Sequence, residues 1–535
     1  MVGSLREVLS ENEPNTLIAK FLFLIVAIFS LHSAVTITVW WQSLPFFTLV
    51  LICGLLISGG YEDIKFTVMR LVGMEVTNSQ ESLPENPDEK VGGIASFTPS
   101  DGVSLELFST LNEDPDYMGS GNVFRPDFIH GVTTEGERIT LKNCIRGSYS
   151  MSSSQGFGVT SSSYQAISLL SGAHFTEQIN FDRFRMQFPL LTKWAGVSGV
   201  NYSGSVLEGG KVSAGDTFEI TYEFPESITA ALDDVELKLI FNADFNMGRV
   251  GGASIDEEAY FDIIPDSGKI SYDEAIDYTR TLQDFITLST GKEVQASTLI
   301  GRLEREDQPG YNDVEILFST GSDLKLPDSL HPNKANFVLA DIIDDFSKVM
   351  DNWFLHYEEL EPVYNLYFST QYNSEMYLQN QFLSLTQAIE TYHRRELGGQ
   401  YLSESEFEEF YDDLCEMIPD QFDESFQDHL ERGTFKYANE YSLRKRLSEL
   451  VTEQKNILEE LPMDVEGSVN EIVNTRNYLT HYDESISPRA DTDELYPLIL
   501  RLRAILETVL LSNLGIPEDQ IVKRLQQRYS ELTRS

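Results

Sequence analysis

The chain has 535 residues and a formal net charge of −46 at pH 7, from 85 acidic residues against 39 lysines and arginines. With 41% hydrophobic and 11% aromatic residues, it can form the cores of two or three domains, which excludes a disordered acidic tail. Acidic residues run through nearly every segment after residue 61, whereas an acidic surface for a basic partner, the alternative, would concentrate them in one block. Because molar salt shortens the Debye length to about 3 Å, this spread predicts a halophilic protein.

The first elements predicted along the chain are membrane spans. No charged residue occurs from Phe21 to Gly60, and a bilayer core needs about 20 helical residues, so we expect a transmembrane helical hairpin near 18–60. The shorter second span could instead be re-entrant, and a cleaved signal peptide is a competing interpretation that the length of the run disfavours. Basic residues on both sides favour cytoplasmic ends. We therefore predict an anchor at 1–72, a polar linker at 73–90 and a cell-membrane protein whose main domains are cytoplasmic.

The next region has the period of β-strands. Apolar and polar residues alternate over 217–224 and 235–241, which predicts half-buried strands. Shorter candidate strands are 103–108, 138–141, 178–189 and 259–264. We expect a mainly-β domain at 91–325, built as a sandwich or a barrel, with one helix near 272–288. The serine-rich run 148–163 is interpreted as a solvated turn, with a binding loop as the alternative.

Helical periodicity follows a linker at 326–334 and continues to the end of the chain. Candidate helices are 336–360, 378–396, 403–417, 442–461, 465–482, 494–514 and 517–532. Ser403 with Glu406 predicts a capping box, and Gly515 predicts a helix end. The predicted fold class is thus multidomain α+β, with a transmembrane hairpin, a mainly-β middle domain and an all-α bundle at 335–535.

Signatures of common enzymes are absent. The sequence has no GxxxxGK[ST] loop, no GxGxxG after a strand, no HExxH, no GxSxG and no EF-hand loop. Cys53, Cys144 and Cys415 are far apart and form no CxxC pair. The histidines outside the candidate site show no ligand spacing. We therefore expect no disulfide framework, no metal and no cofactor.

The remaining candidate for chemistry is the polar set Arg476, Asn477 and His481. In an ideal helix Asn477 and His481 share a face, whereas Arg476 and His481 diverge by about 140°. Arg476 and His481 therefore meet only where the helix ends or bends, or where a second subunit supplies one of them. An alternative for His481 is a helix-terminal imidazole favoured by the macrodipole or bonded to Asp483.

Spacing alone is weak support, since an arginine followed by histidine at this distance is expected about once by chance in such a chain. Arg125 and His130 show the same spacing, but Pro126 forces extended backbone there. We therefore treat that second pair as a coincidence inside the β region.

Three helical segments carry a family resemblance: FLSLTQAIETYHRR (382–395), SLRKRLSEL (442–450) and NEIVNTRNYLTHYD (470–483). Together they resemble the HEPN nuclease superfamily, specifically the ApeA-like HEPN domain of antiphage proteins. Three upstream segments, at 124–144, 181–196 and 281–294, resemble the β-rich N-terminal domain that accompanies it. The resemblance covers about 90–535, and only the anchor falls outside it.

The resemblance implies a metal-independent endoribonuclease of abortive infection that acts as a homodimer under an unknown phage-derived trigger. By the superfamily signature, Arg476 would hold the phosphate, Asn477 would orient the backbone or His481, and His481 would be the general acid or base. Glu390 and Tyr392 would support the site from a facing helix, although Glu390 could also be a solvated position. His393 and the arginines after it are interpreted as a polar face.

RNA is a polyanion, so a protein this acidic needs a less acidic surface to bind it. Residues 501–535 hold six basic and four acidic residues, a net charge of +2, and Arg444, Lys445 and Arg446 form a second basic cluster. Solvated helix faces explain the same residues nearly as well. Two other functions stay open: a non-catalytic membrane-tethered sensor or adaptor that binds nucleotide or protein, and, less well supported, a ligand-gated pore.

Overall fold

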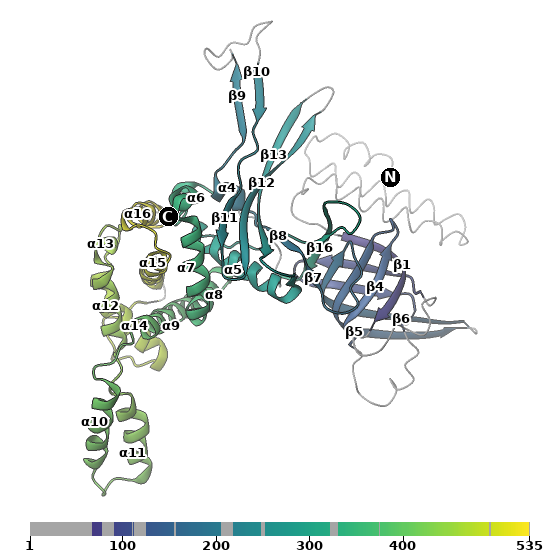
Figure 1. Cartoon of the computed structure of the whole chain (residues 1–535). Helices are drawn as coiled ribbons and strands as arrows, with labels where there is room; N and C mark the ends of the chain where they lie inside the picture. Colours follow the sequence, from purple (N-terminus) through teal and green to yellow (C-terminus); the bar gives the residue numbers. More distant parts are fainter. Residues whose placement is uncertain are drawn as a thin grey trace, which may run out of the picture. The chain divides into compact units, whose positions relative to one another are not determined.

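A computed structural model describes residues 67–77, 90–109, 111, 125–154, 157–204, 218–247, 252–320, 330–373, 375–491 and 494–533 (Figure 1). The hairpin expected near 18–60 and most of the linker expected at 73–90 lie outside these residues. Within the described part of the chain, no helix has both the length and the apolarity needed to cross a bilayer. The membrane anchor therefore stays a prediction.

Six antiparallel strands form a sheet that closes on itself. They follow the order β6-β3-β2-β1-β4-β5, and β5 pairs back with β6. The strands are β1 (Thr67–Thr77), β2 (Gly93–Thr98), β3 (Gly102–Leu107), β4 (Phe128–Thr133), β5 (Arg138–Ser154) and β6 (Phe157–Ser171). Alternate side chains of a strand point to opposite faces, so Leu105, Ile139 and Leu141 lie inside a small separate core with Tyr164.

Two segments of this sheet differ from the sequence prediction. Strand β1 occupies residues assigned to the end of the anchor and the start of the linker, and it pairs with β2 and with β4. Most of the serine-rich run 148–163, predicted as a solvated turn, is β-strand, since residues 149–154 pair with residues 157–162, from Tyr149 opposite Ser162 to Ser154 opposite Phe157. Backbone hydrogen bonds between two long neighbours form this ladder, and serine side chains give no apolar alternation that would reveal it.

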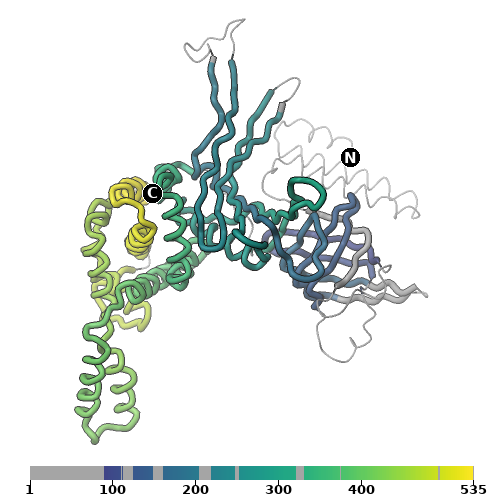
Figure 2. Tube along the Cα trace, in the orientation of Figure 1, coloured from purple at the N-terminus to yellow at the C-terminus, as the bar shows by residue number. Residues whose placement is uncertain are grey.

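A second sheet has the order β11-β12-β13-β8-β15-β16 and joins the first where β16 pairs with β6. Its strands are β8 (Arg183–Gln187), β11 (Ile228–Ala231), β12 (Val235–Met247), β13 (Ala253–Pro265), β15 (Thr298–Glu304) and β16 (Tyr311–Phe318). Two small two-stranded sheets accompany it. One pairs β7 (Asn180–Phe181) with β14 (Ile270–Ser271), and the other pairs β9 (Val200–Gly204) with β10 (Phe218–Tyr222). The rings of Tyr222 and Phe224 contact Phe245, so side chains of the β9–β10 and β12–β13 hairpins pack together. The backbones of both hairpins project from the sheet (Figure 2). The mainly-β middle region is thus confirmed, as two connected sheets.

The middle region and the helices share one hydrophobic core. Besides the short α4 (Leu191–Ala195), the middle region contains α5 (Tyr272–Thr290), which begins with a capping box between Ser271 and Glu274. The indole nitrogen of Trp194 donates to the carbonyl of Phe337, and that of Trp353 donates to the carbonyl of Thr281, each at 3.1 Å. The domains predicted at 91–325 and 335–535 are therefore not separate in packing, because side chains of both contribute to the same core.

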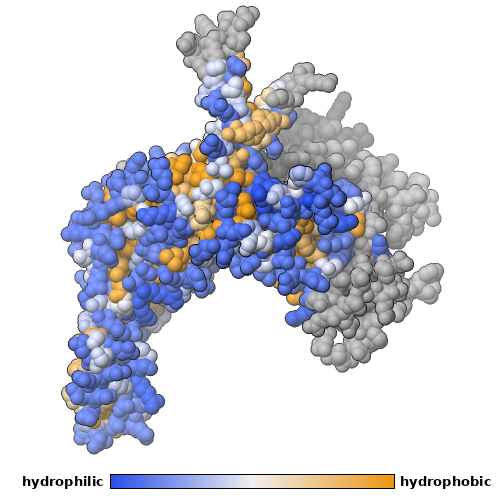
Figure 3. Space-filling model, in the orientation of Figure 1, coloured by the Kyte–Doolittle hydropathy of each residue, from blue (hydrophilic) through white to orange (hydrophobic). Residues whose placement is uncertain are grey.

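The rest of the chain is helical, which confirms the predicted all-α region. Its α-helices are α6 (Leu339–Ile342), α7 (Phe346–Glu359), α8 (Glu361–Tyr372), α9 (Leu378–Glu396), α10 (Glu404–Glu416), α11 (Glu424–Asp428), α12 (Leu443–Glu453), α13 (Lys455–Leu458), α14 (Val469–His481), α15 (Leu495–Asn513) and α16 (Glu518–Leu532). Helix α9 has the predicted bounds, and Ser403 forms the predicted capping box with Glu406. Helices α10 and α11 bury no side chain, and their surface is largely hydrophilic (Figure 3).

A buried carboxylate links α5 to the helical region. Asp284 of α5 accepts a hydrogen bond from the hydroxyl of Tyr357 on α7 at 2.7 Å, and another from the hydroxyl of Tyr372 on α8. Burial raises the pKa of Asp284 from its ordinary 3.8 to about 6, although both hydroxyls favour the charged form.

Replacing this carboxylate makes folding stability less dependent on pH. A folded-state pKa above the unfolded value means that the wild type loses stability as pH rises from about 4 to about 6. Between pH 4 and pH 7 we expect the free energy of unfolding of Asp284→Asn to gain about 2 to 3 kcal/mol relative to wild type, as measured by urea unfolding. The exposed Asp277→Asn should show no such trend, and an Asp284→Asn difference that stays constant with pH would contradict the assignment.

Candidate active site at the end of helix α14

Helix α14 packs one face against α9 and α12. The buried residues of this face are Val469, Ile472, Val473 and Thr475. Arg476 and Asn477 follow on the flank and are half-buried, whereas His481, the last helical residue, is exposed. The amphipathic pattern thus directs the three candidate side chains away from the core.

Arg476 has two polar neighbours. Its Nη2 lies 3.5 Å from Oε2 of Glu390 on α9, and its Nη1 donates to Oδ1 of Asn477 at 3.3 Å. The side chains of Arg476 and Glu390 retain 33% and 26% of their exposure, so this ion pair contributes only about 0 to 1 kcal/mol. A phosphate could therefore compete with Glu390 for the guanidinium.

His481 stands at the point where α14 stops. The next residue, Tyr482, takes left-handed backbone angles (φ 54°, ψ 35°), and its N–H donates to the carbonyl of Tyr478 at 2.6 Å. Within the described residues, the His481 ring hydrogen-bonds no partner, and nothing joins it directly to Arg476 or Asn477. Since the helix ends at His481, one of the conditions under which Arg476 and His481 could meet is present.

Asp483, the alternative partner for His481, is occupied elsewhere. Its Oδ1 accepts from the backbone N–H of Ser485 at 2.9 Å and from the Ser485 hydroxyl at 2.7 Å. These hydrogen bonds lower the pKa of Asp483, with smaller contributions from the charges of Arg489 and His481. The favourable position of His481 at a helix C-terminus remains compatible with a merely structural role.

The loop after α14 returns to the helix that precedes it. The N–H of Ala490 donates to the hydroxyl oxygen of Thr475 at 3.0 Å, and both residues are buried. The side-chain amide of Asn474 donates to the carbonyl of Pro488 at 2.9 Å. The loop 482–491 is therefore held to α14 near its C-terminal end, at Pro488 and Ala490. Its first residue, Tyr482, directly follows His481.

The other candidate residues lie in different surroundings. Tyr392 is only 6% exposed, and its hydroxyl donates to Oδ1 of Asn513 at 3.1 Å. Because it lies two residues beyond Glu390, it is rotated by about 200° around α9, so the structure brings Glu390 but not Tyr392 to Arg476. His130 lies in β4, buried, with Nε2 2.6 Å from the carbonyl of Phe175.

His393 is buried rather than part of a polar face. Its Nδ1 accepts from Nη1 of Arg446 at 3.1 Å, so Nε2 carries the proton and donates to Glu449 at 2.9 Å. Burial lowers the pKa of His393 and so favours the neutral ring. The hydrogen bond to Glu449 acts in the opposite direction but is the smaller effect. Leu385, Ile389 and His393 recur every four residues, and this apolar stripe is the sequence signal that could have placed His393 inside.

The predicted basic surface is smaller than its composition indicates. Arg446, Arg524 and Arg528 are each at most 8% exposed. Arg524 pairs with Asp341 and Arg528 pairs with Glu507, both at 2.8 Å. These guanidinium groups hold helices together and are not free to bind RNA, which a count of charges along the sequence cannot detect.

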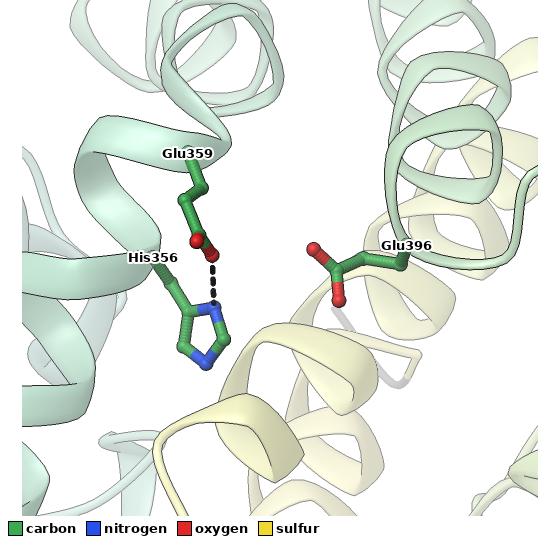
Figure 4. A group of neighbouring side chains, drawn as sticks. All are labelled: His356, Glu359 and Glu396. Carbon is green, nitrogen blue, oxygen red and sulfur yellow. Dashed lines mark ion pairs between the residues drawn. The ribbon is translucent and has the colours of Figure 1, made fainter.

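Among the described residues, one group of side chains could hold a metal ion. His356 and Glu359 on the last turn of α7 and Glu396 at the end of α9 bring candidate ligand atoms within 4.8 Å of one another (Figure 4). Histidine nitrogen and carboxylate oxygen lie about 2.0 to 2.2 Å from zinc, so the two exposed glutamates would have to move inward. Exposed carboxylates often approach each other without an ion, and no function is assigned to this group. The sequence did not reveal it because its members come from two helices.

Two family models match the chain. The model for ApeA N-terminal domain 1 matches residues 80–353, just over half of the chain, and the model for Apea-like HEPN matches residues 383–520. The first match extends into α7, in keeping with the shared core, and the second contains Glu390 and all of α14. Comparison with curated proteins and with solved structures gives no match.

The hydrogen bond between Thr475 and Ala490 can be tested with an isosteric change. Thr475→Val leaves the buried N–H of Ala490 without its partner, and we expect the free energy of unfolding to fall by about 1 to 3 kcal/mol. Hydrogen exchange of residues 482–491 should accelerate, whereas the exposed Thr480→Val on the same helix should leave it unchanged. Unaltered exchange in Thr475→Val would show that another contact holds the loop.

Proposed function

The chain belongs to the ApeA family and carries an Apea-like HEPN domain, and from this premise we propose that it is a membrane-anchored antiphage endoribonuclease. The observation that carries the proposal is the arrangement on α14. A half-buried guanidinium and amide lie on its flank, and an exposed imidazole stands at its end. These are the groups that cleavage of RNA without a metal requires.

Each of the three side chains has a role in this proposal. Arg476 exchanges its weak ion pair with Glu390 for the scissile phosphate and stabilises the charge that develops on it. Asn477, which already accepts from Arg476, orients the guanidinium. His481 has no competing hydrogen bond among the described residues and takes the proton of the 2′-hydroxyl.

The reaction follows from the chemistry of RNA. The 2′-oxygen attacks phosphorus, the bond from phosphorus to the 5′-oxygen breaks, and the products end in a 2′,3′-cyclic phosphate and a 5′-hydroxyl. The leaving 5′-oxygen takes a proton from water or from an imidazole of a second copy. A C2 homodimer would place two α14 ends at one cleft and so overcome the divergence of about 140° between Arg476 and His481.

Loss of the imidazole or the guanidinium should abolish cleavage. With labelled single-stranded RNA and the full-length protein in detergent, we expect His481→Ala and Arg476→Ala to cut at least about 100-fold more slowly than wild type, in dilute and in molar KCl. His331→Ala, an exposed histidine in another segment, is the matched control and should cut normally. A 2′-O-methyl substrate should resist cleavage. Equal cutting by wild type and His481→Ala would exclude this site.

Two features also support a second function. Arg476 is already paired with Glu390, and among the described residues of one chain no hydrogen bond or ion pair joins Arg476 to the His481 ring. In this second function the bundle is a membrane-tethered sensor or adaptor that binds nucleotide or protein without cutting. The two functions separate in infected cells. Protection by His481→Ala and Arg476→Ala equal to that of wild type would favour the adaptor, and loss of protection would favour the nuclease.

The membrane anchor is a separate part of the proposal and rests on the uncharged segment Phe21–Gly60. We infer that it places the protein where phage entry is detected, with a phage-derived trigger acting on the β-rich region. Deletion of residues 1–60 keeps β1 and should move the protein to the soluble fraction and weaken protection against infection. Equal protection by the intact and the deleted protein would exclude a role for the membrane.

A further inference from the structure

We propose that Tyr482 is a stacking site for an RNA base, next to the scissile phosphate. The inference rests on the proposed nuclease function and extends it to recognition of the substrate. Three observations carry it: the exposure of the Tyr482 ring, the side chains that support it from behind, and a backbone conformation that this residue type disfavours.

Tyr482 is 70% exposed although it adjoins a well-packed helix. Its neighbour in space is Tyr478, one turn earlier on α14, and the ring centroids lie 5.7 Å apart with planes at 67°. In this edge-to-face contact the two rings cannot stack on each other. The open ring surface of Tyr482 is therefore available to a planar ligand.

Arg489 supports this pair from the returning loop. Its guanidinium lies 3.9 Å from the centroid of the Tyr478 ring. Its own position is set by Glu484, whose carboxylate it contacts at 2.6 Å, and by the carbonyl of Ile486, to which Nη1 donates at 2.8 Å. One face of Tyr478 is thus covered by a cation, and Tyr482 is the ring of the pair that is left open.

The backbone of Tyr482 is the third observation. Tyr482 follows the end of a helix with a positive φ. The residue at such a position is usually glycine, because a Cβ atom makes this conformation unfavourable. Besides Tyr482, only Asn143 has a positive φ among the described residues other than glycine. A bulky side chain at such a position that contributes little to the core is typical of a functional constraint.

Position and chemistry together define the ligand. The ring belongs to the residue that follows His481, so a base on it comes from a nucleotide adjacent to the one whose 2′-hydroxyl meets the imidazole. Stacking on an aromatic ring requires an unpaired base, because bases in a duplex hide their faces. The site therefore fits single-stranded RNA, and it tolerates different bases because every base has a π-face.

The binding experiment uses the full-length protein and a fluorescein-labelled, 2′-O-methyl single-stranded oligonucleotide, which binds without being cut. Tyr482→Ala and Tyr482→Gly should weaken binding about 5- to 100-fold, and Tyr482→Phe should bind as the wild type does. Tyr377→Ala removes an even more exposed tyrosine at the start of α9, and it should bind normally. Within the oligonucleotide, one abasic position should weaken binding to the wild type but not to Tyr482→Ala.

A stability measurement separates this role from a structural one. Because glycine tolerates a positive φ, Tyr482→Gly should melt at the same temperature as wild type or higher, while losing RNA affinity. A variant that is at least as stable but binds more weakly is not explained by damage to the fold. Light scattering should show the same mass for each Tyr482 variant as for wild type, and a changed mass would reassign the ring to a subunit contact and overturn the proposal.

Three further outcomes of the binding experiment would overturn the proposed stacking site. Binding by Tyr482→Gly equal to wild type, no binding of the probe by wild type, or a Tyr482→Phe variant as weak as Tyr482→Ala would each overturn the stacking site. Failure of the nuclease function has a different signature, because His481→Ala would then cut RNA as wild type does. If His481→Ala is inactive while Tyr482→Gly binds and cuts normally, the nuclease stands and the stacking site does not.

Discussion

The functional interpretation depends on where α14 ends. One face of the helix is buried against α9 and α12, which fixes Arg476 and Asn477 on the flank. The left-handed backbone of Tyr482 then stops the helix immediately after His481. His481 is the last residue of the helix, so its imidazole leaves the axis about 140° from the Arg476 guanidinium, and the proposed C2 pairing would bring these two groups together from two copies. Because the loop returns to the buried hydroxyl of Thr475, the end of the helix is held in a defined place.

Helix α9 is the common support of this region. It contacts α8, α12, α14 and α15, and it presents Glu390 to Arg476. Its His393 is locked to α12 by Arg446 and Glu449, so α9 and α12 form a fixed base for α14. The same hydrophobic core continues through α7 to α5, where Asp284 meets Tyr357 and Tyr372. The β-rich region and the helical bundle are therefore joined by one continuous packed core.

Local patterns in the sequence predicted those elements whose signals are themselves local. The apolar stripe gave α9 its bounds, and Ser403 with Glu406 marked the start of α10. Elements that depend on pairing between strands were missed: β1 lies between β2 and β4, and the serine-rich ladder depends on backbone hydrogen bonds. The burial of Arg524 and Arg528 against acidic residues of other helices was equally inaccessible. At the candidate site, the family resemblance singled out Arg476, Asn477 and His481 as candidates, and the structure adds that Glu390 approaches Arg476 whereas Tyr392 does not.

The most direct test of the central claim is a structure of the assembled protein bound to a 2′-O-methyl RNA that cannot be cut. The nuclease interpretation predicts one phosphate in hydrogen-bond contact with the Arg476 guanidinium, and the adjacent 2′-oxygen about 3 Å from an imidazole of His481, from the same or the paired copy. RNA bound on another surface, or α14 ends that face apart in every assembly, would contradict it.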